Sequence, residues 1–391
     1  MYGSVLSISS TDFLPSRLSN MSLALCITSL FLAYLITNAI YSLTLHPLAR
    51  FPGPRLAAVS RIPFWIACIT GKQVQWMHTL HTRYGPAVRY APNDLSYIDE
   101  GSTSSAWKSI HGHERGEYEL PKAKEWFVTP ANGNVPSSRP SISFQLTLSD
   151  IYGINSAIPH QTHRRYRRLF APAFSDRALR AQEPLFQRHI SHLLTRLSTS
   201  TVPIDLVKLY QFTTFDIMGD LTFGQPLGLL ESNQYSHWVQ AVFDSIRAIP
   251  IAQFIQHYPI LDRLFKLVEP KWIRDMKYAH FRHSADRVDK RLERGSDEPD
   301  IWNLVLEAGE EGLSLEEMYC HADVFMLAGS ETTGTTLASV TYFLLRDQQR
   351  MERCKREVRE VFGEGAEITI ERVAGCRYLN ACESIVLLRR R

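Results

Sequence analysis

The first strong pattern along the chain is an apolar run near its N-terminus. Residues 18–45 contain no charged side chain, and the run exceeds the roughly 20 residues that a helix needs to cross a bilayer. Arg50, Arg55 and Arg61 follow it, against the single Arg17 before it. Because basic residues gather on the cytosolic side of a span, the pattern predicts a membrane anchor, preceded by a short segment (residues 1–17), with the rest of the chain in the cytosol.

A cleaved signal peptide and a buried core helix are the alternatives for this run. The apolar core of a signal peptide is normally shorter and ends at small residues near a cleavage site, whereas this run passes directly into HPLARFPGPR. The FPGP stretch at residues 51–54 cannot continue a helix, because each proline lacks an N–H donor and has a fixed φ. Residues 46–60 are therefore predicted to form a Pro-rich hinge. One large domain, or two closely associated ones, is expected over residues 61–391.

Beyond the hinge, the apolar spacing predicts mostly helices. A helix ending near Tyr84 is followed by a Gly-Pro turn and a short strand pair around Ala87 to Ile98. From Gln161 onward most segments are long and have apolar residues at helical spacing. The expected fold class is mainly α with a minor β-sheet.

The longest predicted helix lies near the C-terminal end. Ser314 and Glu317 form a capping box at its start, and apolar residues recur at helical spacing from Leu315 to a predicted end near Asp347. An unbroken helix of about 33 residues would be roughly 50 Å long and would cross the whole domain.

The middle of this helix, LAGSETTGTTLASV from Leu327 to Val340, is a poor helix sequence. Gly329 and Gly334 each cost about 1 kcal/mol relative to alanine, and such departures from local preference often mark functional sites. A glycine there would let a flat ligand approach the backbone, while Thr332 could bond the carbonyl four residues back. The alternative is that the threonines pack as small core residues and that Glu331 points to solvent.

Composition and charge narrow the class of protein. The chain has 391 residues, 45% of them hydrophobic and 21% charged, which is typical of a folded domain and not of a disordered chain. A formal net charge of +3 gives no reason to expect a nucleic acid partner. The six cysteines form no CxxC pair, so neither a disulfide framework nor a zinc site is indicated.

Several stretches, in this order along the chain, resemble the cytochrome P450 monooxygenases, in particular membrane-bound fungal enzymes of secondary metabolism. They include the N-terminal span, the FPGP hinge, RYGPAVRYAPNDLSYID, HRRYRRLFAPAFSDRALRAQEPL and FTTFDIMGDLTFGQPLGLLE. The segment AGSETT, Ala328 to Thr333, matches the central-helix motif of that family. The resemblance implies the P450 fold and a haem cofactor, with the anchor in the endoplasmic reticulum membrane.

The resemblance also implies roles for six residues. Ala328 and Gly329 would line the groove where dioxygen sits beside the haem, and Glu331 with Thr332 would relay protons there. His163 and Arg167 match the residues that hold the haem propionates, for which an arginine fork is well suited. A solvated basic helix face is the alternative for HRRYRR, and we expect Arg164, Arg165 and Arg168 to belong to one. The site requires a flat cleft beside Ala328, with Glu331 and Thr332 away from the outer surface.

The sequence departs from the family in two places. The family's haem-ligating cysteine motif and its upstream Glu-x-x-Arg motif are absent, so the resemblance implies a fold incomplete at its C-terminus and no metal ligand in this chain. Cys376 and Cys382 are conceivable substitute ligands, although ordinary structural thiols are the simpler explanation. The Ser-rich segment Ser138 to Ser156 interrupts the family pattern, and we interpret it as a retained intron, which transcript sequencing would test.

The resemblance implies a monooxygenase that inserts one oxygen atom into a small lipophilic metabolite, with electrons from a partner reductase that uses NADPH. The alternative is a catalytically inactive, membrane-anchored remnant or fragment. Without further C-terminal helices, the apolar face of the 314–347 helix would remain exposed and would favour aggregation.

Overall fold

A computed structural model describes residues 13–98, 153–155, 160–268, 270–295, 299–306, 312–363 and 366–388. The chain divides into two compact units, residues 1–120 and 121–391. The Ser138 to Ser156 segment lies outside the described residues except for 153–155, so its interpretation as retained intron stays a prediction.

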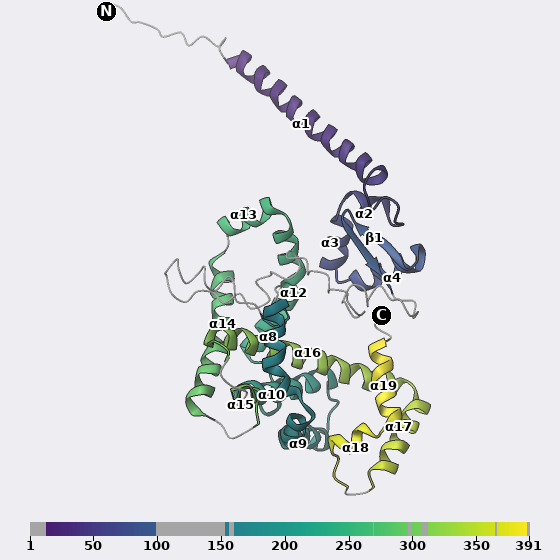
Figure 1. The fold of residues 1–391 in the computed structure, drawn as a ribbon, viewed down its shortest axis with the longest axis vertical. Coiled ribbons are helices and arrows are strands. Elements are labelled where there is room, and N and C mark those ends of the chain that lie inside the picture. Colours follow the sequence, from purple (N-terminus) through teal and green to yellow (C-terminus); the bar gives the residue numbers. More distant parts are fainter. Residues whose placement is uncertain are drawn as a thin grey trace, which may run out of the picture. The chain divides into compact units, whose positions relative to one another are not determined.

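The first unit contains the predicted N-terminal helix. Helix α1 spans Phe13–Thr44, and its portion Leu25–Thr44 is long and apolar enough to cross a membrane. Most of its described side chains are exposed, and it extends as a single rod from the rest of the unit (Figure 1). A helix that exposes apolar residues all around differs from the one-sided amphipathic helices of a soluble surface.

The rest of the first unit is a small helical layer beside a two-stranded sheet. Strands β1 (Ala87–Ala91) and β2 (Asp94–Tyr97) are antiparallel, as predicted. They follow helices α2 (Arg55–Val59), α3 (Ile62–Ile69) and α4 (Gln73–Tyr84). Gly85, at φ +96°, ends α4 because a residue with a Cβ rarely adopts that angle.

The predicted Pro-rich hinge contains the start of a short helix and a backbone hydrogen bond to strand β1. Pro54 precedes the first residue of α2 and has a φ of −65°, the angle that its ring imposes in any context. Within the predicted hinge, residues 46–60, the chain starts the short helix α2. The Arg89 N–H also donates to the Pro52 carbonyl at 2.8 Å, which fixes the proline stretch to strand β1.

The second unit is helical throughout its described part. Its elements are α8 (His160–Phe170), the 3₁₀ turn η2 (Ala171–Phe174), α9 (Asp176–Thr199), α10 (Leu206–Phe223), α11 (Leu229–Ser232), α12 (His237–His257), α13 (Pro259–Val268), α14 (Lys271–Arg294), α15 (Ile301–Leu306), α16 (Leu315–Arg346), α17 (Gln348–Val361), α18 (Ile370–Ala374) and α19 (Arg377–Leu388). Together with the single strand pair, this confirms the predicted fold class.

Helix α16 is the axis of this unit, and α10 packs along it (Figure 1). The predicted capping box is present, since Glu317 N donates to Ser314 Oγ and Ser314 N donates to the Glu317 carboxylate. The helix runs unbroken for 32 residues, as predicted. The core around it is built from buried aromatic and aliphatic side chains that include Tyr166, Phe170, Phe212, Phe215, Trp302, Phe325 and Met326.

Helix α10 is fixed at both ends and in its middle by polar groups. Asp205 caps its N-terminus, and Gly224 ends it at φ +62°. The buried Asp216 carboxylate accepts hydrogen bonds from Leu229 N (3.0 Å) and Leu230 N (2.8 Å), which are free amides at the start of α11. A buried carboxylate is tolerated here because both of its oxygens receive N–H donors.

The C-terminal third of α16 has few packing partners. Leu337, Tyr342, Phe343 and Leu345 are each at least 40% exposed, while α17, α18 and α19 cluster beside that end of the helix (Figure 1). This confirms the predicted exposed apolar face among the residues that the structure describes.

Candidate functional site

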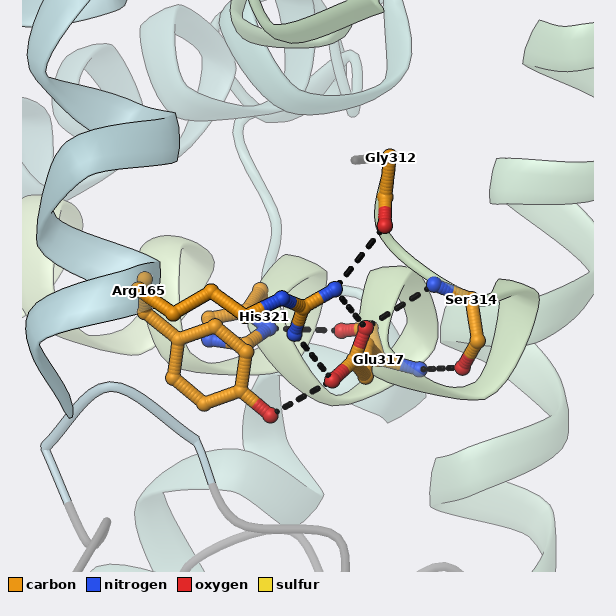
Figure 2. A network of polar contacts seen from close by, with 6 residues as sticks. Arg165, Gly312, Ser314, Glu317 and His321 are labelled. Carbon is orange, nitrogen blue, oxygen red and sulfur yellow. Dashed lines mark hydrogen bonds and ion pairs between the residues drawn. The ribbon is translucent and has the colours of Figure 1, made fainter. Parts of the chain in front are cut away.

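The N-terminal turn of α16 is joined to α8 by a polar network centred on Glu317 (Figure 2). Arg165 approaches the Glu317 carboxylate with both terminal nitrogens, at 2.7 and 3.2 Å, and also donates to the Gly312 carbonyl at 2.9 Å. The Tyr166 hydroxyl donates to the same carboxylate at 2.8 Å. Because the forked guanidinium fits a carboxylate well, this network fixes the angle between the two helices.

Electrostatics in this network follow from burial and hydrogen bonding. Burial acts to raise the pKa of Glu317, but hydrogen bonds from Arg165, Ser314 N and Tyr166 together outweigh it and lower that pKa. Burial and the bond to Glu317 raise the pKa of Tyr166. The network therefore holds a carboxylate, a guanidinium and a neutral phenol at neutral pH.

Arg165 and Tyr166 belong to the HRRYRR stretch. Our expectation that Arg165 lies on a solvated face was wrong, because its side chain is partly buried and paired with Glu317. Arg164 and Arg168 are exposed. Of the two predicted propionate ligands on α8, His163 is half-buried and Arg167 is exposed.

His321, one turn of α16 beyond Glu317, is fully buried against Tyr166, Phe170 and Phe325. Its Nδ1 lies 2.7 Å from the Glu317 carbonyl, so Nδ1 carries the proton and donates it. Nε2 has no partner among the described residues. Burial lowers the pKa of His321 to about 4, so this histidine is neutral at physiological pH.

Eleven residues beyond Glu317, or about 16 Å of helix, α16 reaches its glycine- and threonine-rich middle. A Cβ on Gly329 would collide with the Met218 side chain of α10, and one on Gly334 would lie 3.1 Å from Thr214 Oγ1. Thr214 Oγ1 in turn donates to the buried Ser330 carbonyl at 2.9 Å. On the face of α16 that packs against α10, small residues allow the two helices to lie close together.

A different face of the same turns carries the predicted oxygen-side residues. Ala328 and Thr332 are exposed, and Glu331 is half-buried. Thr332 Oγ1 donates to the Ala328 carbonyl at 2.5 Å, which is the bond to the carbonyl four residues back that the sequence suggested. Thr335 Oγ1 donates to Glu331 Oε1 at 2.9 Å. The hydroxyls of Thr332 and Thr335 and the carboxylate of Glu331 therefore lie within about one turn of α16.

The structure thus places Ala328, Glu331 and Thr332 on one face of α16, whereas Gly329 faces Met218 of α10. It places His163 and Arg167 on α8, which contacts the first turn of α16 through Arg165. The two cavities described for this chain lie at the end of α1 and on α17, and the cleft expected beside Ala328 stays a prediction. The roles of all six residues stay predictions, and the family must be established independently of them.

Comparison with known proteins decides the family. The model of the cytochrome P450 family matches residues 127–383, more than half of the chain. The chain belongs to the cytochrome P450 family. This membership agrees with the helical fold, the small sheet and the AGSETT motif of α16.

Several fungal P450 enzymes are similar to this chain over most of its length. It is 42% identical over 352 residues to the P450 monooxygenase FUM2 of Gibberella moniliformis, covering 88% of this chain and 70% of that protein. It is 37% identical to the P450 monooxygenase efuB of Hormonema carpetanum, covering 90% of this chain and 67% of that one. With the averantin hydroxylase of Dothistroma septosporum the identity is 36%, covering 90% and 62%. The chain therefore spans about two thirds of the length of these relatives.

P450 membership implies haem, and the cysteines of the chain test whether its residues fit that group. A haem-thiolate site needs a sulfur that ionises. Burial raises the pKa of Cys68 to about 11 and that of Cys320 to about 12, and it also raises those of Cys354 and Cys382. Cys376 is fully buried and Cys26 lies in α1. Iron would itself take the place of the thiol proton, so burial of the sulfur decides the fit. Cys320, Cys354 and Cys376 are buried with no face open to a flat haem, and these three residues do not fit a thiolate-ligated haem, whereas Cys68 and Cys382 are partly exposed.

Two structurally important residues escaped the sequence analysis. Arg165 was assigned to solvent because its acidic partner is remote in sequence. Arg89 is only 2% exposed, and its one sequence signal was a charged residue between apolar neighbours in a strand. Both residues escaped sequence analysis for the same reason: local patterns do not show which distant groups surround a charged side chain.

Proposed function

We propose that this chain contributes the anchor and the oxygen-side helix of a haem-thiolate monooxygenase that inserts one oxygen atom into a small lipophilic secondary metabolite. A partner reductase using NADPH would supply the electrons, at the cytosolic face of the endoplasmic reticulum membrane. The main support beyond family membership is the stretch of α16 on which Ala328, Glu331 and Thr332 lie together.

The proposed roles differ between the two helices. His163 and Arg167 of α8 would hold the haem propionates, and the small side chain of Ala328 would leave room for dioxygen. Thr332 and Glu331 would position and transfer protons, because a hydroxyl can accept one proton while donating another. We propose that the axial thiolate comes from sequence that these 391 residues do not include.

An inactive, membrane-anchored protein is the second candidate, and the cysteine chemistry favours it for this chain as it stands. The sulfurs of Cys320, Cys354 and Cys376 are buried and have no face open to a flat haem. Such a chain would keep its anchor and its α10–α16 core without supplying a thiolate ligand.

The absorbance difference spectrum with carbon monoxide separates the two candidates. We expect the purified full chain, reduced in the presence of haem, to lack the red-shifted band of a thiolate-ligated haem. A clear band that is lost in Cys376→Ser or Cys382→Ser would show a substitute ligand, which would reject the inactive candidate and the assignment of the thiolate to other sequence.

A further inference from the structure

The first unit contains a cavity of about 360 Å³ at the end of the anchor helix. Its walls come from the last turn of α1, the following turn and proline stretch, the start of α2, and strand β1. The lining residues are Leu43, Ala49, Phe51, Pro52, Gly53, Arg55, Ala58 and Arg89. A volume of this size is within the range of small-ligand sites.

Arg89 lines this cavity and is buried. Its Nη1 donates to the Ser42 carbonyl (2.8 Å), its Nη2 to Ser42 Oγ (3.0 Å) and to the carbonyls of Pro92 (2.7 Å) and Ala58 (3.4 Å), and its Nε to the Pro92 carbonyl (3.2 Å). One N–H of Nη1 is left for a further acceptor. Among the described residues no carboxylate pairs with it. A buried cation surrounded only by neutral acceptors leaves a positive potential in the cavity.

Arg55 adds a second positive charge at the entrance. Its side chain is exposed, and the structure describes no hydrogen bond or ion pair for it. The sequence from residue 13 to 93 has no acidic side chain and seven Lys and Arg residues, and the first carboxylate, Asp94, pairs with Arg61. An anion entering the cavity would therefore meet two arginines and no nearby acid from this stretch.

The position of the cavity indicates where such an anion would come from. The apolar span Leu25–Thr44 is about 30 Å long, the thickness of the hydrocarbon core. Leu43 lies at the end of that span and also lines the cavity. If α1 crosses the membrane, the cavity opens at the depth of the phospholipid headgroups.

We propose that this cavity binds the phosphate of an anionic phospholipid headgroup between Arg55 and Arg89. The inference rests on the membrane anchoring included in the proposed function. A bound headgroup would tie the end of α1, the proline stretch and β1 to one lipid, and would fix the first unit against the membrane surface.

The test uses the full chain in phosphatidylcholine nanodiscs that contain a photoactivatable phosphatidylserine, with adducts located by peptide mass spectrometry. We expect adducts on peptides covering residues 43–58. Arg55→Gln should lower their yield about tenfold more than Arg50→Gln does, the effect of one charge-assisted hydrogen bond. Arg50 is a neighbouring exposed arginine that does not line the cavity, so its variant measures the general attraction of basic residues to the anionic surface.

Control variants and soluble competitors distinguish a headgroup site from general surface attraction and from a site for soluble phosphate. Arg83→Gln, which changes an exposed arginine elsewhere in the unit, should leave the adducts unchanged. Equal losses in the Arg50 and Arg55 variants would overturn the site in favour of general surface attraction. Loss of adducts upon addition of inorganic phosphate or glycerol 3-phosphate would overturn the lipid assignment in favour of a soluble phosphate.

Extraction from membranes tests the anchor separately from the headgroup site. A chain that alkaline carbonate releases from membranes would reject both the anchor and the headgroup site. A chain that stays in the membrane but gives no adducts on residues 43–58 would reject the headgroup site alone.

Discussion

At the scale of single residues, Glu317 connects the most groups around α16. Its carboxylate accepts bonds from Arg165, Tyr166 and Ser314 N, so Glu317→Gln removes the charge that all three use. We expect the variant to lower the free energy of unfolding of the full chain in detergent by about 2 kcal/mol, measured by urea titration. Glu316→Gln is the matched control on the same turn, and an equal effect of the two variants would contradict the network's role.

His321 gives a pH-dependent prediction. An unfolded histidine gains a proton near pH 6.5, whereas the pKa of folded His321 is about 4. Between these values the unfolded state binds more protons, so stability is lost as the pH falls through that interval. The loss should reach about 3 kcal/mol.

His321→Gln should remove this part of the pH dependence, while His237→Gln, at an exposed position, should retain it. Urea titrations of both variants at several pH values between 4 and 7 provide the measurement. An unchanged pH profile in His321→Gln would show that another group titrates in that interval.

At the scale of elements, the contact between α10 and α16 explains both glycines of the α16 motif. A Cβ on Gly334 would lie 3.3 Å from Gln211 Cα and 3.1 Å from Thr214 Oγ1, so Gly334→Leu must push the helices apart. We expect it to lower the free energy of unfolding by about 2–3 kcal/mol. Gly363→Leu is the control, because a Cβ at Gly363 meets no atom within 4 Å; comparable losses would argue against close helix packing.

The elements themselves were largely predictable, because each has a local cause. The Ser314 and Glu317 capping box, the apolar spacing to Arg346, and the Gly-Pro turn after Tyr84 all act within a few residues. The contacts between helices at the site were less predictable. The pairing of Gly329 with Met218 and of Arg165 with Glu317 depends on helices that are distant in sequence, and no periodicity encodes such a pairing.

At the scale of the whole molecule, the bare apolar end of α16 should govern self-association. Phe343 and Leu345 are 41% and 64% exposed, and exposed apolar patches promote association. Phe343→Gln with Leu345→Gln should raise the monomeric fraction in size-exclusion chromatography in mild detergent. Val202→Gln with Val207→Gln, at two other exposed positions, should not change it; equal effects would point to total surface hydrophobicity.

The central claim is that the Ala328 face of α16 lies against the haem in the complete enzyme. It is tested most directly by the carbon monoxide spectrum of a chimera in which residues 1–379 are continued by the C-terminal part of FUM2. We predict that this chimera shows the thiolate band, and that Ala328→Leu lowers its intensity severalfold. Thr333→Leu, at an exposed position on the same turn, should leave the band unchanged. A chimera without the band, or a band that Ala328→Leu does not change, would contradict the claim.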